Sequence, residues 1–409
     1  MSMRKTTGVV ALSTAVALVL AACGGRGGDS EGSPGITDDS LTLGVITPLS
    51  GTTAGPGNCT VAGLAAYMGA ANEDGGIEFG DGVTREIVIE ALDDQYDPQQ
   101  SLSAFQQNSS DIFAFTSGLG TPTNRAFREA AIDGEVPQVL IQTGDPIFND
   151  REESPWQLGF IPVYQNEGAA FGEMLADSGE DLTVGILSQN DDFGEGYVEG
   201  FKEAIEGADN IEIVGEYTYE ATDTAVDAQL TELAATDADV FLNAMSITPL
   251  AISTIEKARE LQWEPAWMLP SNTSSPAGIL EPAGANVDDG FYTVAFSKAP
   301  QSPEFADDED VTAFLDNLEA HASAYTTSPD FPHCMWSYMI GATLEQAFMN
   351  MEEPTRESFM DALFNISDFQ APLMLDGTAV DTTQDGNPAV SQLVVQRYNG
   401  TGYETVDSF

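Results

Sequence analysis

The residue types that most often carry enzymatic chemistry are scarce in this 409-residue chain. There are two histidines, His321 and His333, and neither has a partner at the spacing of a metal site or a catalytic triad. His321 also lies in an acidic segment, which predicts a solvated helix face. Chemistry based on a histidine is therefore not expected.

The loops that activate a nucleophile or hold a phosphate are also missing from the sequence. No Gly-x-Ser-x-Gly turn, phosphate-loop lysine or His-Glu-x-x-His motif occurs. Gly194, Gly196 and Gly200 have the wrong spacing for a dinucleotide loop, and the acids between them would repel a pyrophosphate. Pairs such as Asp93-Asp94 and Asp191-Asp192 have low specificity in a chain this acidic. We predict that the protein is not an enzyme and uses no metal or cofactor.

Acidic residues far outnumber basic ones. The chain has 66 Asp plus Glu against 13 Lys plus Arg, a formal charge of −53. Such a polyanion repels nucleic acid and anionic lipid headgroups, so neither is expected as a partner. Because 42% of the residues are hydrophobic, the chain is expected to fold. We interpret the charge as a surface suited to saline surroundings, where cations screen it.

The N-terminus predicts export. Arg4 and Lys5 precede an apolar run that ends at Leu20-Ala21-Ala22-Cys23 and is too short to span a bilayer core of about 30 Å. The final four residues resemble a bacterial lipobox, so residues 1–22 are the expected signal and Cys23 the expected lipid anchor. An ordinary secretory signal, with Cys23 incidental, is the alternative. Residues 23–40 are rich in Gly, Ser and acids and are expected to form a flexible tether.

Beyond the tether, predicted strands and helices alternate in two blocks. In the first block we expect a glycine-rich loop at 50–58, strands at 41–48, 85–91, 112–117 and 136–141, and helices at 59–72, from 97 onward and at 121–134. The second block predicts strands at 182–188, 211–219, 240–244 and 266–269, and helices at 166–178, 196–206, 226–235 and 248–261. This order is typical of parallel, doubly wound sheets. Two such lobes would share a ligand cleft at the carboxyl ends of their strands.

Cys59 and Cys334 remain once Cys23 is assigned to lipid. An exported protein meets conditions that permit disulfides. The two thiols are far apart in sequence, so composition alone leaves open both a disulfide and two separate buried cysteines.

Motifs in both blocks resemble those of the type I periplasmic binding proteins, and most closely the branched-chain amino acid receptors of ABC importers. They occur in family order from Leu41 to Phe409, at 45–51, 75–77, 93–98, 117–124, 136–138, 143–144, 155–156, 192–194, 258–259 and 271–273. The resemblance implies two doubly wound α/β lobes joined by a multi-strand hinge. It divides the chain into lobe 1 at 41–160 and 296–375, and lobe 2 at 161–295 with a lobe 2 and hinge segment at 376–409.

The resemblance also implies where a ligand binds. A ligand carboxylate is expected at Gly120 and Thr121, where backbone amides and a helix N-terminus suit an anion. Thr121 is equally explained as a helix cap. The other expected contacts are Gln142, Thr143, Gly144, Phe193, Met245, Ser271 and His333. On the same grounds Cys59 and Cys334 are expected to lie in one lobe and to form a disulfide.

Two departures from the family pattern concern the ligand. The Thr or Ser that usually follows the fourth strand is shifted or replaced by Gly144. Ser271 stands where amino acid receptors place a carboxylate that pairs with the ligand's ammonium. Asp145 could replace that carboxylate, or it could cap a turn. An aliphatic amino acid and an unaminated aliphatic or aromatic acid therefore both remain possible ligands, because an unpaired buried ammonium is costly.

The implied function is that of an extracytoplasmic substrate-binding lipoprotein of an ABC importer. The lobes would close on a small-molecule ligand and deliver it to a permease. The lipid on Cys23 would be the only contact with the membrane. The alternative is a lipoprotein sensor that uses the same fold for signalling.

Overall fold

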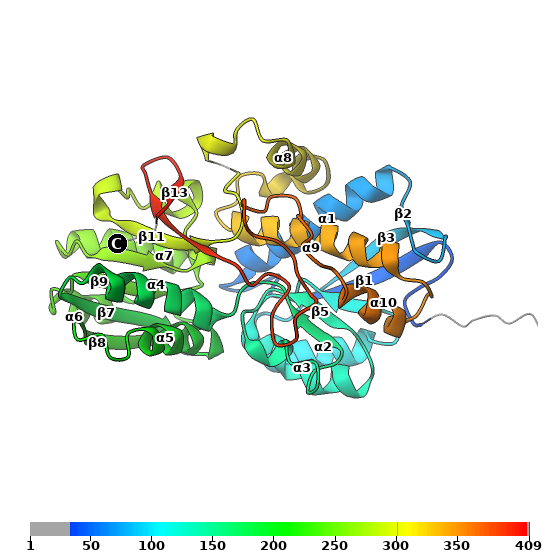
Figure 1. The fold of residues 1–409 in the computed structure, drawn as a ribbon, viewed down its shortest axis with the longest axis horizontal. Helices are drawn as coiled ribbons and strands as arrows, with labels where there is room; N and C mark the ends of the chain where they lie inside the picture. Colours follow the sequence, from blue (N-terminus) through cyan, green and yellow to red (C-terminus); the bar gives the residue numbers. More distant parts are fainter. Residues whose placement is uncertain (1–32, 301, 407–408) are drawn as a thin grey trace, which may run out of the picture. The chain divides into compact units, whose positions relative to one another are not determined.

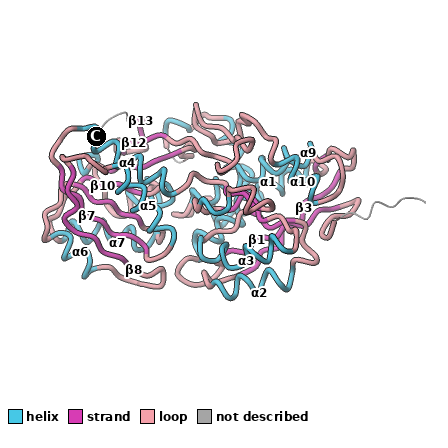
Figure 2. Tube along the Cα trace, turned by 60° about the horizontal axis from the view of Figure 1, so that its bottom comes forward, coloured by secondary structure: helices cyan, strands magenta, loops and turns pink. Residues whose placement is uncertain are grey.

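The computed structural model describes residues 33–300, 302–406 and 409. The predicted signal, Cys23 and the tether as far as residue 32 lie outside the described residues. Within the described ranges, no helix is long and apolar enough to cross a membrane. Figure 1 shows the arrangement of the elements, and Figure 2 shows the strands of each sheet flanked by helices.

The first sheet has six strands in the order β2-β3-β1-β4-β5-β6, and every pairing is parallel except β2 with β3. Its strands are β1 (Ser40–Thr47), β2 (Ile77–Glu78), β3 (Thr84–Asp93), β4 (Ala114–Thr116), β5 (Gln138–Ile141) and β6 (Gln157–Gly159). The helices that follow its strands are α1 (Ala54–Glu73), α2 (Pro98–Asn108) and α3 (Thr121–Asp133). The later helices α8 (Glu309–Ala322) and α9 (Phe331–Asn350) pack on α1, and α10 (Arg356–Leu363) packs on α9.

The second sheet has seven strands in the order β13-β12-β11-β10-β9-β7-β8. Its strands are β7 (Leu182–Gln189), β8 (Ile211–Tyr219), β9 (Val240–Ala244), β10 (Ala266–Leu269), β11 (Phe291–Ala295), β12 (Val394–Tyr398) and β13 (Tyr403–Thr405). The pairings of β11 with β12 and of β12 with β13 are antiparallel, and the other pairings described in this sheet are parallel. Its helices are α4 (Tyr164–Ser178), α5 (Asp192–Ala204), α6 (Asp227–Ala234) and α7 (Thr248–Glu260). The chain passes between the sheets after β6, after β11 and before β12.

The predicted α/β class with two parallel-dominated sheets is confirmed. The predicted loop at 50–58 is wrong, because α1 already begins at Ala54. A Cβ atom on Gly57 would lie 2.0 Å from the carbonyl oxygen of Pro48, so this glycine permits close packing of a helix rather than marking a loop. For a similar reason α5 begins at Asp192 and not at residue 196: Gly194 packs tightly on Gln189 inside the first turn.

A disulfide joins α1 to α9 through Cys59 and Cys334, whose Cα atoms lie 4.5 Å apart. The two helices are in close contact, since a Cβ atom on Gly63 of α1 would overlap the carbonyl oxygen of Cys334. The N-terminal ends of both helices are thereby fixed beside each other.

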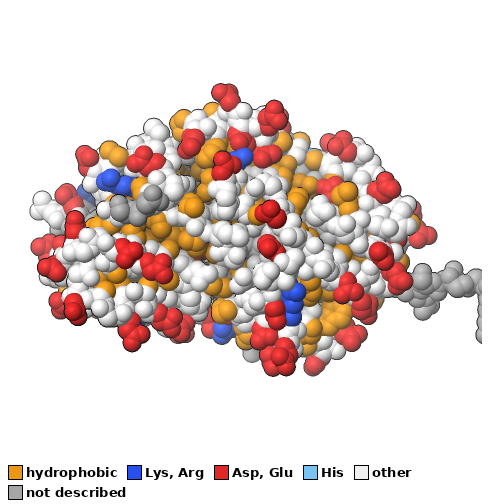
Figure 3. All heavy atoms as spheres, in the orientation of Figure 1, with side chains coloured by type: hydrophobic (Ala, Val, Ile, Leu, Met, Phe, Trp, Pro, Cys, Tyr) orange, Lys and Arg blue, Asp and Glu red, His pale blue; other side chains and the backbone are white. Residues whose placement is uncertain are grey.

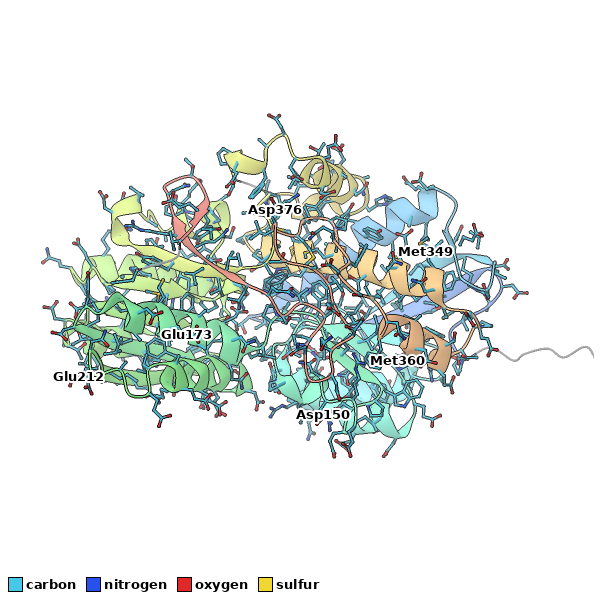
Figure 4. The ribbon with its side chains drawn as sticks, in the orientation of Figure 1. Asp150, Glu173, Glu212, Met349, Met360 and Asp376 are labelled. Carbon is cyan, nitrogen blue, oxygen red and sulfur yellow. A yellow bond between two sulfur atoms is a disulfide. The ribbon has the colours of Figure 1, made fainter. Side chains whose placement is uncertain are left out.

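Acidic side chains are spread over the visible face of the molecule, with few basic ones among them (Figure 3). Asp150, Glu173, Glu212 and Asp376 are examples that lie exposed on separate segments (Figure 4). Among the described residues, several basic groups are paired with acids, as in the ion pairs of Arg85 with Asp81 and Lys298 with Asp308. The negative charge therefore lies on the outside of the fold.

Candidate ligand-binding site

A cavity, called here the cleft cavity, lies between the two lobes at the carboxyl ends of their strands. It contains about 520 Å³ of empty space that is partly open to solvent. Side chains from both lobes line it, and six of them are predicted contacts: Gly120, Thr121, Gln142, Phe193, Ser271 and His333.

The other predicted contacts do not line the cleft cavity. Thr143 lies behind Thr121, with 2.8 Å between the two hydroxyl oxygens. Gly144 packs against Tyr164, and Met245 is fully buried in the hydrophobic core of the second lobe. Its neighbour Ser246 lines the cavity instead. Adjacent residues at the end of a strand point to opposite sides, so a one-residue error moves the side chain out of the site.

Three helices of the first lobe begin at the cleft cavity: α1 after Thr53, α3 after Gly120 and α9 two residues before His333. None of their N-cap residues caps the helix with its side chain. The α5 helix of the second lobe differs, because the Asp191 carboxylate accepts hydrogen bonds from the amides of Phe193 and Gly194. The first-lobe helices therefore offer amides and positive dipole ends to an anion. At α5, by contrast, the Asp191 carboxylate already occupies the amides and neutralises the positive end of the helix.

A cluster of hydroxyl groups lies beside the N-terminus of α3. The Tyr164 hydroxyl is 3.4 Å from the hydroxyl oxygens of both Thr121 and Thr143. Burial raises the pKa of Tyr164 to about 12, so its hydroxyl stays neutral at physiological pH. The Tyr164 ring packs edge-on against Phe193, with 5.0 Å between ring centres. The cluster can thus donate hydrogen bonds to a ligand carboxylate and contact its apolar part.

Two buried polar atoms in the cavity wall have no hydrogen-bond partner among the residues that the structure describes. They are the hydroxyl oxygen of Thr53 in the first lobe and the side-chain carbonyl oxygen of Asn272 in the second. Buried polar atoms are nearly always hydrogen-bonded in folded proteins. A polar group of a ligand could therefore form the missing hydrogen bonds to these two atoms.

His333 is held in one orientation by Gln142. The Gln142 amide nitrogen donates to the His333 carbonyl oxygen (3.2 Å) and to the Ser337 hydroxyl (2.7 Å), which leaves its oxygen facing His333 Nδ1 at 2.8 Å. Burial lowers the His333 pKa to about 3, so the ring is neutral and its proton lies on Nδ1. The remaining nitrogen, Nε2, is then a hydrogen-bond acceptor.

Glu167, on the first turn of α4, lies directly behind Ser271. Its carboxyl group accepts hydrogen bonds from the Ser271 hydroxyl (3.1 Å), the Ser271 amide (3.3 Å) and the Tyr197 hydroxyl. While Glu167 is ionised, Ser271 donates its proton to that carboxylate, and the serine oxygen then accepts from a ligand. An acid therefore lies one layer behind Ser271, at Glu167.

Burial raises the pKa of Glu167 from its usual 4.5 to about 7. Between these pH values the folded protein keeps a proton that the unfolded chain releases. Its contribution to stability is therefore complete below pH 4.5 and is lost as the pH rises through 7, a change of about 3 kcal/mol.

We expect the Glu167→Gln variant to lose this pH dependence. Relative to the variant, the free energy of unfolding of the wild-type protein should fall by about 3 kcal/mol between pH 4 and pH 8. Denaturant unfolding at both pH values in the same salt measures it. Glu173→Gln, on the exposed side of the same helix, is the matched control and should leave the dependence unchanged. Equal wild-type and Glu167→Gln slopes would show that Glu167 does not titrate in this range.

Several contacts cross between the lobes at the rim of the cleft cavity. The Tyr96 hydroxyl donates to the Asp191 carboxylate (3.1 Å), and the Thr248 hydroxyl donates to Asp330 (2.5 Å). Arg125 of α3 pairs with Asp192 of α5 and with Asp145 of its own lobe. Asp145 also caps the short turn at Ile147, so both of its oxygens have partners outside the cavity. Of its two expected roles, the structure gives it the turn cap.

Glu167, Tyr197 and Trp336 were not predicted as site residues. They lie within the helices α4, α5 and α9, where the sequence pattern indicates only a buried face. The one available signal was Glu167 itself, an acid at helical spacing between Tyr164 and Phe171 on the buried face of α4. Within the part of the chain that the structure describes, no group of His, Cys, Asp and Glu side chains could hold a metal ion.

Comparison with known proteins gives consistent matches. The sequence profile of the periplasmic binding protein family matches residues 40–402. A Leu/Ile/Val-binding protein homolog from Brucella abortus (strain 2308) is 27% identical over 172 residues, which cover 40% of this chain and 43% of that relative. The aligned part is thus less than half of the relative's length.

Two solved structures illustrate the similarity in fold. A substrate-binding periplasmic protein from Ralstonia solanacearum has a TM-score of 0.75 at 20% identity, covering 89% of this chain and 100% of that chain. A fatty acid ABC transporter substrate-binding protein from Thermomonospora curvata has a TM-score of 0.76 at 21% identity, covering 92% of this chain and 93% of that chain.

Proposed function

Because this chain belongs to the periplasmic binding protein family, we propose that it captures a small carboxylate-bearing ligand and delivers it to an ABC permease. Members of this family are extracytoplasmic solute-binding proteins and not enzymes. We also propose that a lipid on Cys23 anchors the protein, and that the lobes have the boundaries predicted from the sequence.

The observation that carries the proposal is the uncapped N-terminus of α3 at the cleft cavity. Gly120 has a φ of 109°, a conformation that favours glycine, and it precedes a helix whose first amides have no intrahelical partner. The hydroxyl cluster of Thr121, Thr143 and Tyr164 lies beside it. Amides, hydroxyls and a helix dipole together favour a carboxylate even in a strongly acidic protein.

The rest of the cleft cavity supports two ligand classes. Ser271 and His333 Nε2 present acceptors, which suit an amino or hydroxyl group on the ligand. Glu167 is a buried acid directly behind Ser271, and its raised pKa means that it offers only part of a negative charge near pH 7. An amino acid and an unaminated acid are therefore both proposed, in keeping with the amino acid and fatty acid names of the similar proteins.

Closure would follow from contacts that only the paired lobes can make. Thr53 and Asn272 contribute one unpartnered atom from each lobe, so a ligand bound to both favours the closed form. The crossing contacts of Tyr96 and Thr248 support the same state.

A thermal-shift screen in high salt tests the proposal. The panel is leucine, valine, benzoate and short-chain aliphatic acids, each with its primary amide, which lacks the carboxylate charge. At 100 times its Kd, a ligand that binds only the folded protein stabilises it by about 2.7 kcal/mol and raises Tm. We expect at least one acid to raise Tm and its amide not to do so. Leucine binding without any response to unaminated acids would exclude the second ligand class.

A further inference from the structure

A second cavity, called here the hinge cavity, lies next to the cleft cavity. It contains about 550 Å³ of empty space that is partly open to solvent. Its walls come from β11, from the segment 296–300 that follows β11, from the N-terminal part of α9 and from β12 and β13. It therefore lies where the chain passes between the two lobes.

The hinge cavity presents an apolar surface. Phe296, Phe331, Met335 and Trp336 are among its lining residues, and the rings of Phe296 and Trp336 stack with 5.5 Å between their centres. None of these groups offers a charge to a ligand.

Several polar side chains of the hinge cavity already have partners in the protein. The Tyr403 hydroxyl donates to the Ser274 carbonyl oxygen (2.6 Å), and the Thr293 hydroxyl donates to the Leu269 carbonyl oxygen (3.0 Å). The Lys298 ammonium at the rim donates to the Asp308 carboxylate (2.7 Å). A ligand group in this cavity would gain mainly from the burial of apolar surface.

The two cavities share the side chains of Ser271 and Trp336 as walls. The cleft cavity offers amides, hydroxyls and unpartnered oxygens to a ligand, and the hinge cavity offers aromatic rings. We propose that the hinge cavity binds the apolar end of the ligand whose carboxylate lies at Gly120 and Thr121. The preferred ligand is then a monocarboxylate whose chain or ring extends beyond the length of a leucine side chain. This inference rests on the proposed function.

Calorimetric titration with butyrate, hexanoate and octanoate in high salt tests the inference. Each methylene that enters the hinge cavity should lower Kd about fourfold, which corresponds to about 0.8 kcal/mol per buried methylene. Ala295→Leu, which adds bulk to a cavity wall on β11, should abolish the gain for octanoate and change the Kd of butyrate less than about twofold. Ala299→Leu, in the segment after β11, adds bulk to the same cavity and replaces the first variant in the test if that variant does not fold.

Ala235→Leu adds the same atoms at an exposed position after α6 and is the matched control. Equal Kd values for butyrate and octanoate in the wild-type protein would overturn the inference and leave the proposed function standing. Retention of the octanoate gain in both cavity-filling variants would also overturn it. If no acid of any length binds, the proposed function fails and the inference fails with it.

Discussion

Replacing Gly120 with alanine is expected to weaken ligand binding by about 10- to 100-fold, the loss of one or two hydrogen bonds to a charged group. Gly120 has a φ of 109°, and a Cβ atom there would lie 2.6 Å from the Thr123 hydroxyl and 2.8 Å from the Tyr96 ring. The peptide between Gly120 and Thr121 must then shift, and with it the amides that would hold the carboxylate. Calorimetry with the best acid from the screen measures the effect.

Gly75→Ala is the matched control for this variant. Gly75 has nearly the same φ, 108°, but it is exposed and a Cβ atom there would meet no atom within 4 Å. Both variants carry similar backbone strain, of order 1–3 kcal/mol, and only one touches the cleft cavity. Equal ligand affinity in Gly120→Ala and Gly75→Ala would show that the α3 N-terminus does not bind the ligand.

Removing the disulfide with the pair Cys59→Ala and Cys334→Ala should lower the free energy of unfolding by about 2–5 kcal/mol. The bond closes a chain segment of 275 residues, so its loss greatly enlarges the unfolded ensemble. It also connects the helix that begins after Thr53 to the helix that carries His333 and Trp336. We therefore expect ligand affinity to fall together with stability.

Denaturant unfolding with and without dithiothreitol checks this prediction. Reductant should shift the wild-type midpoint to that of the double variant and should leave the variant unchanged. Labelling of the unreduced, denatured wild-type protein should find neither thiol reactive. Two reactive thiols, or an unfolding midpoint that does not respond to reductant, would contradict a bond between Cys59 and Cys334.

The alternation of strands and helices was predictable because the pattern of buried apolar residues within each segment indicates its type. Strands β8, β9 and β10 have the predicted bounds, and α3 begins at Thr121 and α2 after its Asp97 cap, as expected from the capping residues. The starts of α1 and α5 were mispredicted because their glycines serve close packing, which a single sequence does not distinguish from a turn. Strands β6 and β13 are short and carry little pattern of their own, and β12 pairs with β11, which lies far away in the sequence.

The site was predictable only where a loop motif marks it. Gly120, Thr121 and Phe193 line the cleft cavity and lie in segments with recognisable motifs. The acid behind Ser271 comes from α4, about one hundred residues earlier in the chain, and only the tertiary fold brings the two together. The hinge cavity combines β11, α9 and β13, so no local pattern predicts it.

The central claim is that the cleft cavity recognises a carboxylate at the start of α3. Calorimetric titration of one acid and its primary amide, on the wild-type protein in high salt, tests it most directly. The two compounds have nearly the same shape and differ in charge. We predict that the acid binds at least about tenfold more tightly, because charge-assisted hydrogen bonds are about twice as strong as neutral ones. Equal affinity for the acid and the amide would contradict the claim.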